Sequence, residues 1–307
     1  MEYTKPALTF EQQADLLLQR GLLADKEELI KRLRCVNYYR VTGYLYPFRC
    51  GTARRLTRAI YPDPDPDRFM PGTTLDDFWI RYTYDRRLRL LAFEAIERIE
   101  NALKAQMAEI YSNTYGPFGL EQQSNFPGFR SAGDYEKFVE CLTKEYSRSR
   151  EDFVDHFKSR YGDTHVLPPL WAMIEVMSFG SVVTLYRNSD EDIQQRVADY
   201  FGIKRYMLAS WLLTLYTVRN LCAHHSRLYN RSLQGVNLKI WKEWDRSGIP
   251  RDRVFGLLCA ICELLRHVSS DRDWAAAAAK LMRSQPDVTR RMGAPVEWEK
   301  LPQWKDV

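Results

Sequence analysis

The sequence has 307 residues, of which 45% are apolar, 28% are charged and 13% are aromatic, and its formal net charge is +5. This composition excludes a largely disordered chain and is typical of a soluble globular protein with one large domain or two small ones. The mild positive charge favours an anionic partner, but it lacks the clustered excess of a protein that coats DNA.

The first 72 residues predict an N-terminal helical region followed by a connector. One helix is expected from Leu8 to Gly21, with Thr9 as its N-cap, and a second from Lys26 to about Val36. The following stretch contains Gly43, Pro47 and aromatic residues that favour strands, so it predicts a short hairpin or a turn near 41–60. The segment YPDPDPDRFMPG alternates proline with aspartate and predicts an exposed connector.

From residue 73 to residue 270 the apolar spacing is helical, which predicts the main domain. A long amphipathic helix should begin at threonine caps near Thr74 and reach about residue 111, and a polar loop should cover about 112–133. Further helices are expected at about 134–160, in PPLWAMIEVMSFGSVVTLYRN, from a Ser189 cap to Gly202, in the segment that contains RNLCAHHSRLYNR, and from Asp252 to about His267.

The remaining residues, 271–307, are predicted to form one C-terminal helix, at WAAAAAKLMRS, and a tail without defined order beyond Pro286. No strand alternates with the helices, and no glycine-rich phosphate loop or internal repeat is present. The predicted fold class is therefore an all-α helical bundle.

The sequence also bounds compartment and cofactors. Its longest uncharged run, Tyr206 to Val218, has 13 residues, short of the roughly 20 that span a bilayer. The first residues, MEYTKPALTFEQQ, lack the basic start of a signal peptide, so we expect a cytoplasmic protein with reduced cysteines. Cys259 and Cys262 lie in an apolar helical run and are interpreted as packing residues, with a zinc-supported structural role as the alternative.

The candidate site is RNLCAHHSRLYNR, residues 219–231. An arginine followed by a histidine is weak by itself, because Arg150 with His156 and Arg160 with His165 have similar spacing. The stretch at Arg219 differs in that the arginine continues the apolar helical stripe of Leu208, Leu212, Leu215 and Cys222. An arginine there must be paired or must face an interface, since an unpaired buried charge costs several kcal/mol.

A second stripe, polar and cationic, is predicted on the same helix. It consists of Asn220, His224, Arg227 and Arg231. A histidine with an ordinary pKa near 6.5 is suited to proton transfer from a ribose 2′-hydroxyl, and arginine can stabilise charge on phosphate oxygens. Equally, basic residues commonly decorate a helix C-terminus because they interact favourably with its dipole. Arg219 and His224 lie about 140° apart on an ideal helix, so a bend or a second chain is needed to unite them.

The stretch resembles the signature of HEPN-superfamily ribonucleases, and more narrowly that of abortive-infection proteins of the AbiD/AbiF type. Five blocks of the sequence resemble that family in order: KPALTFEQQADLLLQRGL, VNYYRVTGYLYPF, FMPGTTLDDFWIRYTYDRRLR with AIERIENAL, PPLWAMIEVMSFGSVVTLYRN and RNLCAHHSRLYNR. The resemblance implies a HEPN-type helical bundle, related to the HEPN domains of type VI CRISPR effectors, and a homodimer with a composite active site.

The resemblance further implies metal-independent cleavage of RNA, with no cofactor, in antiphage defence or as the toxin of a toxin–antitoxin pair. Arg219 then corresponds to the motif arginine, Asn220 to its polar neighbour and His224 to the motif histidine. His225, Arg227 and Arg231 are expected to bind the RNA. A restraining antitoxin RNA or protein is a further expected partner, and membrane association is not expected.

Two other features have competing interpretations. The aromatic run from Tyr38 to Phe48, followed by Arg49, Arg54, Arg55 and Arg58, could stack unpaired bases, but packing against the bundle is favoured. Glu94, Glu97 and Glu100 share a helix with many arginines and are interpreted as an ion-paired face rather than metal ligands. The alternative function for the whole chain is a non-catalytic RNA-binding or interaction module on the same scaffold.

Overall fold

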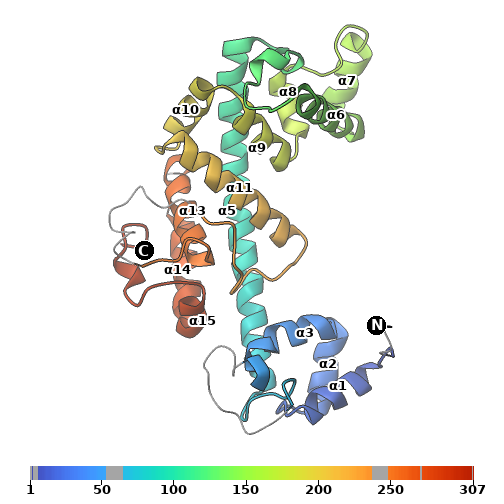
Figure 1. Ribbon diagram of the computed structural model, residues 1–307, viewed down its shortest axis with the longest axis vertical. Helices are drawn as coiled ribbons and strands as arrows, with labels where there is room; N and C mark the ends of the chain where they lie inside the picture. The colour runs from blue at the N-terminus through green and yellow to red at the C-terminus, as the bar shows by residue number, and fades with distance from the viewer. Residues whose placement is uncertain (1, 3–5, 53–64, 237–247, 270–271, 306) are drawn as a thin grey trace. The chain divides into compact units, whose positions relative to one another are not determined.

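The computed structural model describes residues 2, 6–52, 65–236, 248–269, 272–305 and 307. Within these residues the chain forms helices and two isolated bridges but no strand, which confirms the all-α prediction. The chain divides into two compact units, Met1–Arg86 and Arg87–Val307. Helix α5 (Leu75–Tyr115) contributes its first turns to the first unit and the remainder to the second (Figure 1).

The first unit begins with two helices whose ends match their sequence signals. These are α1 (Phe10–Gln19) and α2 (Lys26–Cys35), which pack against each other. Thr9 caps α1 through a reciprocal pair of hydrogen bonds with Gln12, and the Asp25 carboxylate accepts a hydrogen bond from the Glu28 backbone N–H. Gly21 follows α1 at φ 93°, a left-handed conformation that favours glycine and ends the helix where predicted.

The hairpin predicted near 41–60 is wrong for its described part. Residues there form α3 (Tyr38–Leu45) and the 3₁₀ turn η1 (Tyr46–Phe48). The Asn37 side chain caps α3, and Val41, Tyr44 and Leu45 are buried at helical spacing, which outweighs the strand preference of the aromatic residues. Residues 53–60, with Arg54, Arg55 and Arg58, lie outside the described residues.

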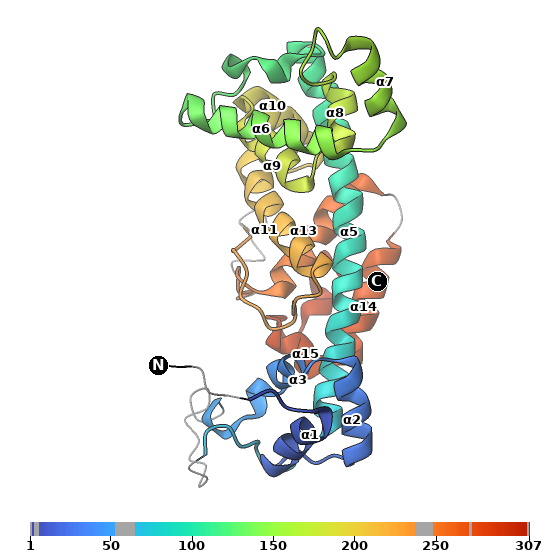
Figure 2. The same cartoon turned by 90° about the vertical axis from the view of Figure 1, so that its right-hand side faces the viewer.

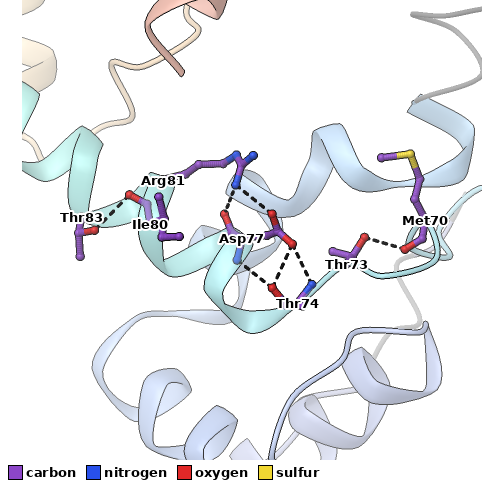
Figure 3. A network of polar contacts seen from close by, with 7 residues as sticks. All are labelled: Met70, Thr73, Thr74, Asp77, Ile80, Arg81 and Thr83. Carbon is purple, nitrogen blue, oxygen red and sulfur yellow. Dashed lines mark hydrogen bonds and ion pairs between the residues drawn. The ribbon is translucent and has the colours of Figure 1, made fainter. Parts of the chain in front are cut away.

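The start of α5 is fixed by a local polar network, shown in Figure 3. The Asp77 carboxylate accepts hydrogen bonds from the backbone N–H and hydroxyl of Thr74, while the Asp77 N–H donates to the Thr74 hydroxyl at 3.3 Å. Arg81 donates from the next turn to the Asp77 carbonyl and carboxylate, and Thr73 donates to the Met70 carbonyl. This reciprocal cap confirms the predicted start of the long helix.

The second unit is a bundle of helices that includes most of α5 and α11 (Arg205–Ala223), as Figures 1 and 2 show. Helices α9 and α10 pack on α11 and on each other, α6 lies beside α8 and α9, and α13 also contacts α11. The other elements are η2 (Gly119–Glu121), η3 (Gln123–Asn125), α6 (Ala132–Arg148), α7 (Asp152–Tyr161), α8 (Leu170–Val176), α9 (Phe179–Asn188), α10 (Glu191–Tyr200), α13 (Val254–Val268), α14 (Asp273–Ser284), α15 (Pro286–Arg291) and η4 (Trp298–Lys300).

Several boundaries differ from the sequence predictions. The helix expected at 134–160 is two helices, α6 and α7, because the chain is extended at Ser149 and Glu151. The helix expected after the paired prolines is likewise divided, because Ser178 stops α8 and caps α9 through the Ser181 N–H. Asp190, rather than Ser189, caps α10.

The tail beyond Pro286, predicted to lack order, packs on α13. The Trp304 indole is buried, donates a hydrogen bond to the Cys259 thiol at 3.1 Å, and lies with its ring centroid 6.0 Å from that of Phe255. Trp298 meets Trp304 edge to face at 5.6 Å. Two large apolar side chains therefore tie the end of the chain to the bundle.

Among the described helices, none combines the length and apolar character needed to cross a membrane.

Candidate active site

The candidate site lies at the C-terminal end of α11, and the buried face of this helix holds it in place. Leu208, Leu212 and Leu215 are fully buried at a spacing of three or four residues, as the apolar stripe predicted. Thr214 additionally donates a hydrogen bond to the Gln234 carbonyl at 2.9 Å, which ties the segment following the helix back to its middle. The buried leucines and the hydrogen bond from Thr214 thus both hold α11 in place next to the candidate site.

Arg219 lies on this stripe between Leu215 and Cys222, and it is paired, which is one of the two possibilities that its position allowed. Its guanidinium lies 3.8 Å from the Glu100 carboxylate and 5.6 Å from the centroid of the Phe93 ring, both on α5. The arginine side chain is 37% exposed, whereas Glu100 is only 12% exposed. The Glu100 carboxylate therefore holds the guanidinium of Arg219 through its Nε atom, while part of the arginine side chain is open to solvent.

Glu100 is a residue that the sequence interpretation missed as part of this site, since it was grouped with an ion-paired face. Besides Arg219 it faces Lys104, whose ammonium is 3.9 Å from its carboxylate. Burial raises the pKa of the Glu100 carboxyl, and the charges of Lys104 and Arg219 oppose that rise. The four-residue spacing to Lys104 was visible in the sequence, but the contact with α11 required the fold.

The C-terminus of α11 is closed by a Schellman turn. The His225 N–H donates to the Cys222 carbonyl at 3.0 Å, and the Ser226 N–H donates to the Leu221 carbonyl at 2.8 Å. His224 is the C-cap, and its N–H donates to the Asn220 carbonyl, so it continues the helical path by one residue. Both histidine side chains are exposed.

His225 occupies the position of this turn that usually holds glycine. Its φ is 54°, in the left-handed region that costs a residue with a Cβ about 1 kcal/mol. Strained backbone of this kind is concentrated at functional sites, where the surrounding structure holds it in place. Here the left-handed backbone conformation of His225 sets the direction in which the chain leaves the helix immediately after His224.

The predicted second stripe is only partly present, because α11 ends at Ala223. Arg227 and Arg231 are beyond the turn and do not continue a helical face with Asn220 and His224. They lie close together in the segment that follows, where the Arg231 guanidinium donates to the Arg227 carbonyl at 3.4 Å. Leu228 and Tyr229, between them, are fully buried and anchor this segment.

The structure therefore brings the predicted residues to one end of one helix without joining all of them. Asn220 and His224 share a face and a backbone hydrogen bond, whereas Arg219 is directed to Glu100 and Phe93 on α5. Because the bend begins only at His225, the offset of about 140° between Arg219 and His224 remains.

The arginine–histidine pairs elsewhere have different surroundings. His165 lies in a loop, as expected, and stacks on Phe118 with ring centroids 3.6 Å apart. His156 lies on α7 beside Asp155. Cys259 and Cys262 are buried in α13, and within the described part of the chain no cluster of three or more His, Cys, Asp or Glu side chains is arranged to hold a metal ion.

Residues 31–230 match the family described as Abi-like protein, which is about two thirds of the chain and includes α11 with the motif from Arg219 to Asn230. The chain belongs to the Abi-like protein family. Arg231, α13, α14 and α15 fall outside the matched residues. Neither the comparison with curated proteins nor the comparison with solved structures gave a match.

Proposed function

We propose that this Abi-like protein is a metal-independent endoribonuclease of the HEPN type that acts in abortive-infection defence against phage or as the toxin of a toxin–antitoxin pair. The RNA's own 2′-hydroxyl attacks the adjacent phosphate, the O5′ leaves, and a 2′,3′-cyclic phosphate is formed. DNA has no 2′-hydroxyl and is not a substrate. Proton transfer and charge stabilisation are the two tasks that the protein must perform.

In this proposal His224 accepts the proton of the attacking 2′-hydroxyl and then gives a proton to the departing O5′, while Arg219 stabilises the negative charge on the phosphate. His224 is exposed at the end of a rigid helix, where an RNA backbone can reach it, and its position is set by the Schellman turn. Asn220, one turn earlier on the same face, orients the phosphate or the attacking group. This placement of a histidine and an asparagine on one open helix end, within the family's matched region, is the observation that carries the proposal.

Arg219 supports the proposal through its restraint by α5. Glu100 and Phe93 hold its guanidinium, which reduces the conformational entropy lost when a phosphate binds. Arg227, Arg231 and His225 lie beside the turn and contribute positive charge for the RNA backbone, His225 when protonated.

The angular offset favours a composite site in a homodimer. Arg219 of one chain and His224 of the same chain diverge by about 140° around the helix axis. A two-fold axis near the end of α11 places His224 of each chain opposite Arg219 of its partner. The active unit is then the dimer, and a protein or RNA that blocks this face restrains the activity.

The deciding experiment incubates the protein with defined single-stranded RNA and DNA of the same sequence in EDTA. Wild type is expected to cut the RNA only and to leave 2′,3′-cyclic phosphate ends, and Arg219→Ala and His224→Ala are expected to be inactive while still binding RNA. His156→Ala serves as the matched control. His156 is an exposed histidine on α7, and it follows Arg150 by six residues. If wild type leaves RNA intact with and without divalent ions, the chain is a binding module instead.

The proposed defence role is tested in cells. Expression of wild type is expected to reduce phage plaque formation or to arrest growth, and His224→Ala is expected to do neither. Mixing Arg219→Ala with His224→Ala chains tests the composite site, because a mixed dimer regains one complete site. Absence of any recovery in the mixture would contradict the shared site.

A further inference from the structure

A pocket of about 400 Å³ opens between α6, α9 and α11 in the second unit. Helix α9 packs against α6 and also against α11. Figure 2 shows α9 between these two helices. The pocket is separate from the residues assigned to cleavage, although two of its lining residues, Leu213 and Tyr216, lie on the same helix. Its other important lining residues are Phe129, Phe138, Lys137 and Arg187.

The exposed face of α11 connects this pocket with the candidate active site. Leu213, Tyr216, Asn220 and His224 follow one another at intervals of three or four residues, so they share one face of the helix. Tyr216 and His224 are eight residues apart, which corresponds to a rise of about 12 Å along the helix. A single strand of RNA with a phosphate at His224 can therefore reach the pocket within a few nucleotides.

The lining of the pocket suits a planar, uncharged group. Tyr216 is 38% exposed, and the ring centroids of Phe129 and Phe138 are 5.5 Å apart in a tilted arrangement. Bases of every type have an aromatic face, and stacking on aromatic side chains is the usual way in which proteins hold unpaired bases. The hydroxyl groups of Ser178 and Thr184 also line the pocket. They already donate to the Ser181 hydroxyl and the Gly180 carbonyl, so they offer the base an oxygen acceptor rather than a proton.

The charges around the pocket favour a base inside it and phosphates at its edge. Lys137 and Arg187 are exposed cations, whereas Asp134 also lines the pocket. The Glu145 carboxylate already accepts hydrogen bonds from the Ser178 N–H and the Ser181 hydroxyl at the start of α9, so that helix end does not offer a vacant anion site. A phosphate in the interior would be repelled by the Asp134 carboxylate of the lining, whereas a neutral base would not be.

Gly180 allows the Tyr216 ring to lie close to α9, where both residues line the pocket. A Cβ added at Gly180 would lie 2.8 Å from Cε2 of the Tyr216 ring, so the ring lies directly against the backbone of α9. Any larger residue at this position must displace the ring. Gly180→Ala therefore changes the shape of the pocket without removing the aromatic side chain.

We propose that this pocket binds one unpaired nucleobase of the RNA substrate and so determines where the strand is cut. The inference rests on the proposed ribonuclease function for its substrate. Tyr216, with Phe129 and Phe138, stacks the base, and Lys137 and Arg187 bind the flanking phosphates. Because stacking alone accepts every base, the oxygen atoms of Ser178, Thr184 and Asp134 in the lining select among base edges by accepting hydrogen bonds from them. The enzyme then prefers particular bases at a fixed distance of a few nucleotides from the cleaved bond.

The first test digests a randomised single-stranded RNA pool and sequences the new ends. Wild type is expected to show a base preference at one fixed position away from the cut. Tyr216→Ala is expected to lose that preference and to lower kcat/KM on the preferred sequence roughly 10-fold, and Gly180→Ala is expected to alter the preference. Tyr206→Ala, which removes another exposed tyrosine of α11 outside the pocket, is expected to behave as wild type.

The second test does not depend on cleavage. His224→Ala protein is crosslinked with ultraviolet light to single-stranded RNA containing 4-thiouridine or 6-thioguanosine, and the modified peptides are identified by mass spectrometry. Crosslinks at Tyr216, Phe129 or Phe138 support the pocket, and a folded Tyr216→Ala, His224→Ala double variant is expected to lose them.

The two proposals fail separately. If wild type does not cut RNA but crosslinks in the pocket, the ribonuclease function is wrong, and the pocket binds a base without directing a cut. If wild type cuts RNA without base preference, or if crosslinks fall only outside the pocket, the base pocket is wrong. If neither cutting nor crosslinking occurs, both are wrong.

Discussion

The Glu100→Gln substitution removes the negative charge between Arg219 and Lys104 while keeping the size of the side chain. In the wild type the Glu100 carboxylate is 3.8 Å from Arg219 and 3.9 Å from Lys104, and it is 12% exposed. We expect the variant to fold, because glutamine can occupy the same space and its amide is cheaper to bury than a carboxylate. The restraint on Arg219, however, is weakened.

The size of the effect follows from the geometry. Two unit charges 3.8 Å apart attract by about 4 kcal/mol at an effective dielectric constant near 20. Since Arg219 is 37% exposed and the carboxylate loses hydration on burial, the net value is much smaller, about 1 kcal/mol. If that energy holds the guanidinium in its productive position, kcat/KM for RNA falls about 5-fold in Glu100→Gln.

The same carboxyl gives a second, independent readout in the pH dependence of stability. Because burial raises the pKa of Glu100 above 4.5, the folded protein binds this proton more tightly than the unfolded chain does. The free energy of unfolding therefore falls as pH rises above 4.5, until the carboxyl is ionised in the folded protein as well, and the cost then persists at higher pH. Glutamine does not titrate, so this part of the pH dependence disappears.

The assay combines urea unfolding across this pH range with steady-state cleavage of single-stranded RNA at neutral pH. Glu94→Gln is the matched control, because Glu94 is an exposed carboxylate on the same helix and its ion pair is with Arg98, 3.2 Å away, rather than with Arg219. The expected result is a slower but equally or more stable Glu100→Gln enzyme. A variant that cleaves at the wild-type rate, or that is less stable than wild type at neutral pH, would refute the assigned role of Glu100.

Three further outcomes are expected. His225→Gly relieves the left-handed strain at φ 54° and raises the free energy of unfolding by about 0.5–1 kcal/mol; a decrease in urea unfolding would mean that its side-chain contacts outweigh the strain. Trp304→Ala lowers the same free energy by about 3–5 kcal/mol, because the indole is buried against α13; a loss below about 1 kcal/mol would show that the tail does not pack there. Of the six thiols, the two exposed ones, Cys35 and Cys141, react rapidly with Ellman's reagent at pH 8, and Cys262 does not, since burial raises its pKa to about 12; stoichiometric zinc in the purified protein would contradict the packing role of Cys259 and Cys262.

Helix existence was readable from the sequence wherever a cap and an apolar period agreed. Thr9, Asp25 and Thr74 each precede a helix whose buried residues recur at helical spacing, and all three starts were found. The segment after Asn37 was misread because its aromatic and β-branched residues favour strands locally. Burial of Val41, Tyr44 and Leu45 on one side decided the outcome, and burial depends on partners distant in sequence.

Helix continuity was less predictable than helix existence. The breaks at Ser149 and Ser178 arise where a serine adopts an extended conformation between two amphipathic segments of similar character. A serine in a helical pattern is compatible with either a helix interior or a cap. The tail beyond Pro286 was misjudged for a related reason, since Trp298 and Trp304 gain their stability from α13, more than 30 residues earlier.

In the candidate site, too, the need for a contact could be predicted from nearby residues, whereas the partner in that contact could not. The apolar stripe correctly implied that Arg219 needs a partner, but nothing in the sequence identifies which of the four glutamates on α5 supplies it. The fold selects Glu100, whose carboxylate lies 3.8 Å from the arginine.

The position at which α11 ends bears on whether one chain can bring Arg219 and His224 to the same phosphate. A bend before His224 could have brought Arg219 and His224 to one phosphate within a single chain. The Schellman turn instead begins at His225, so His224 still follows the helical path and the offset of about 140° persists. The proposed composite site brings both residues to one phosphate across a two-fold axis, and it leaves the strained turn and the Glu100 contact unchanged. Complementation between Arg219→Ala and His224→Ala chains is therefore the measurement on which the catalytic proposal most depends.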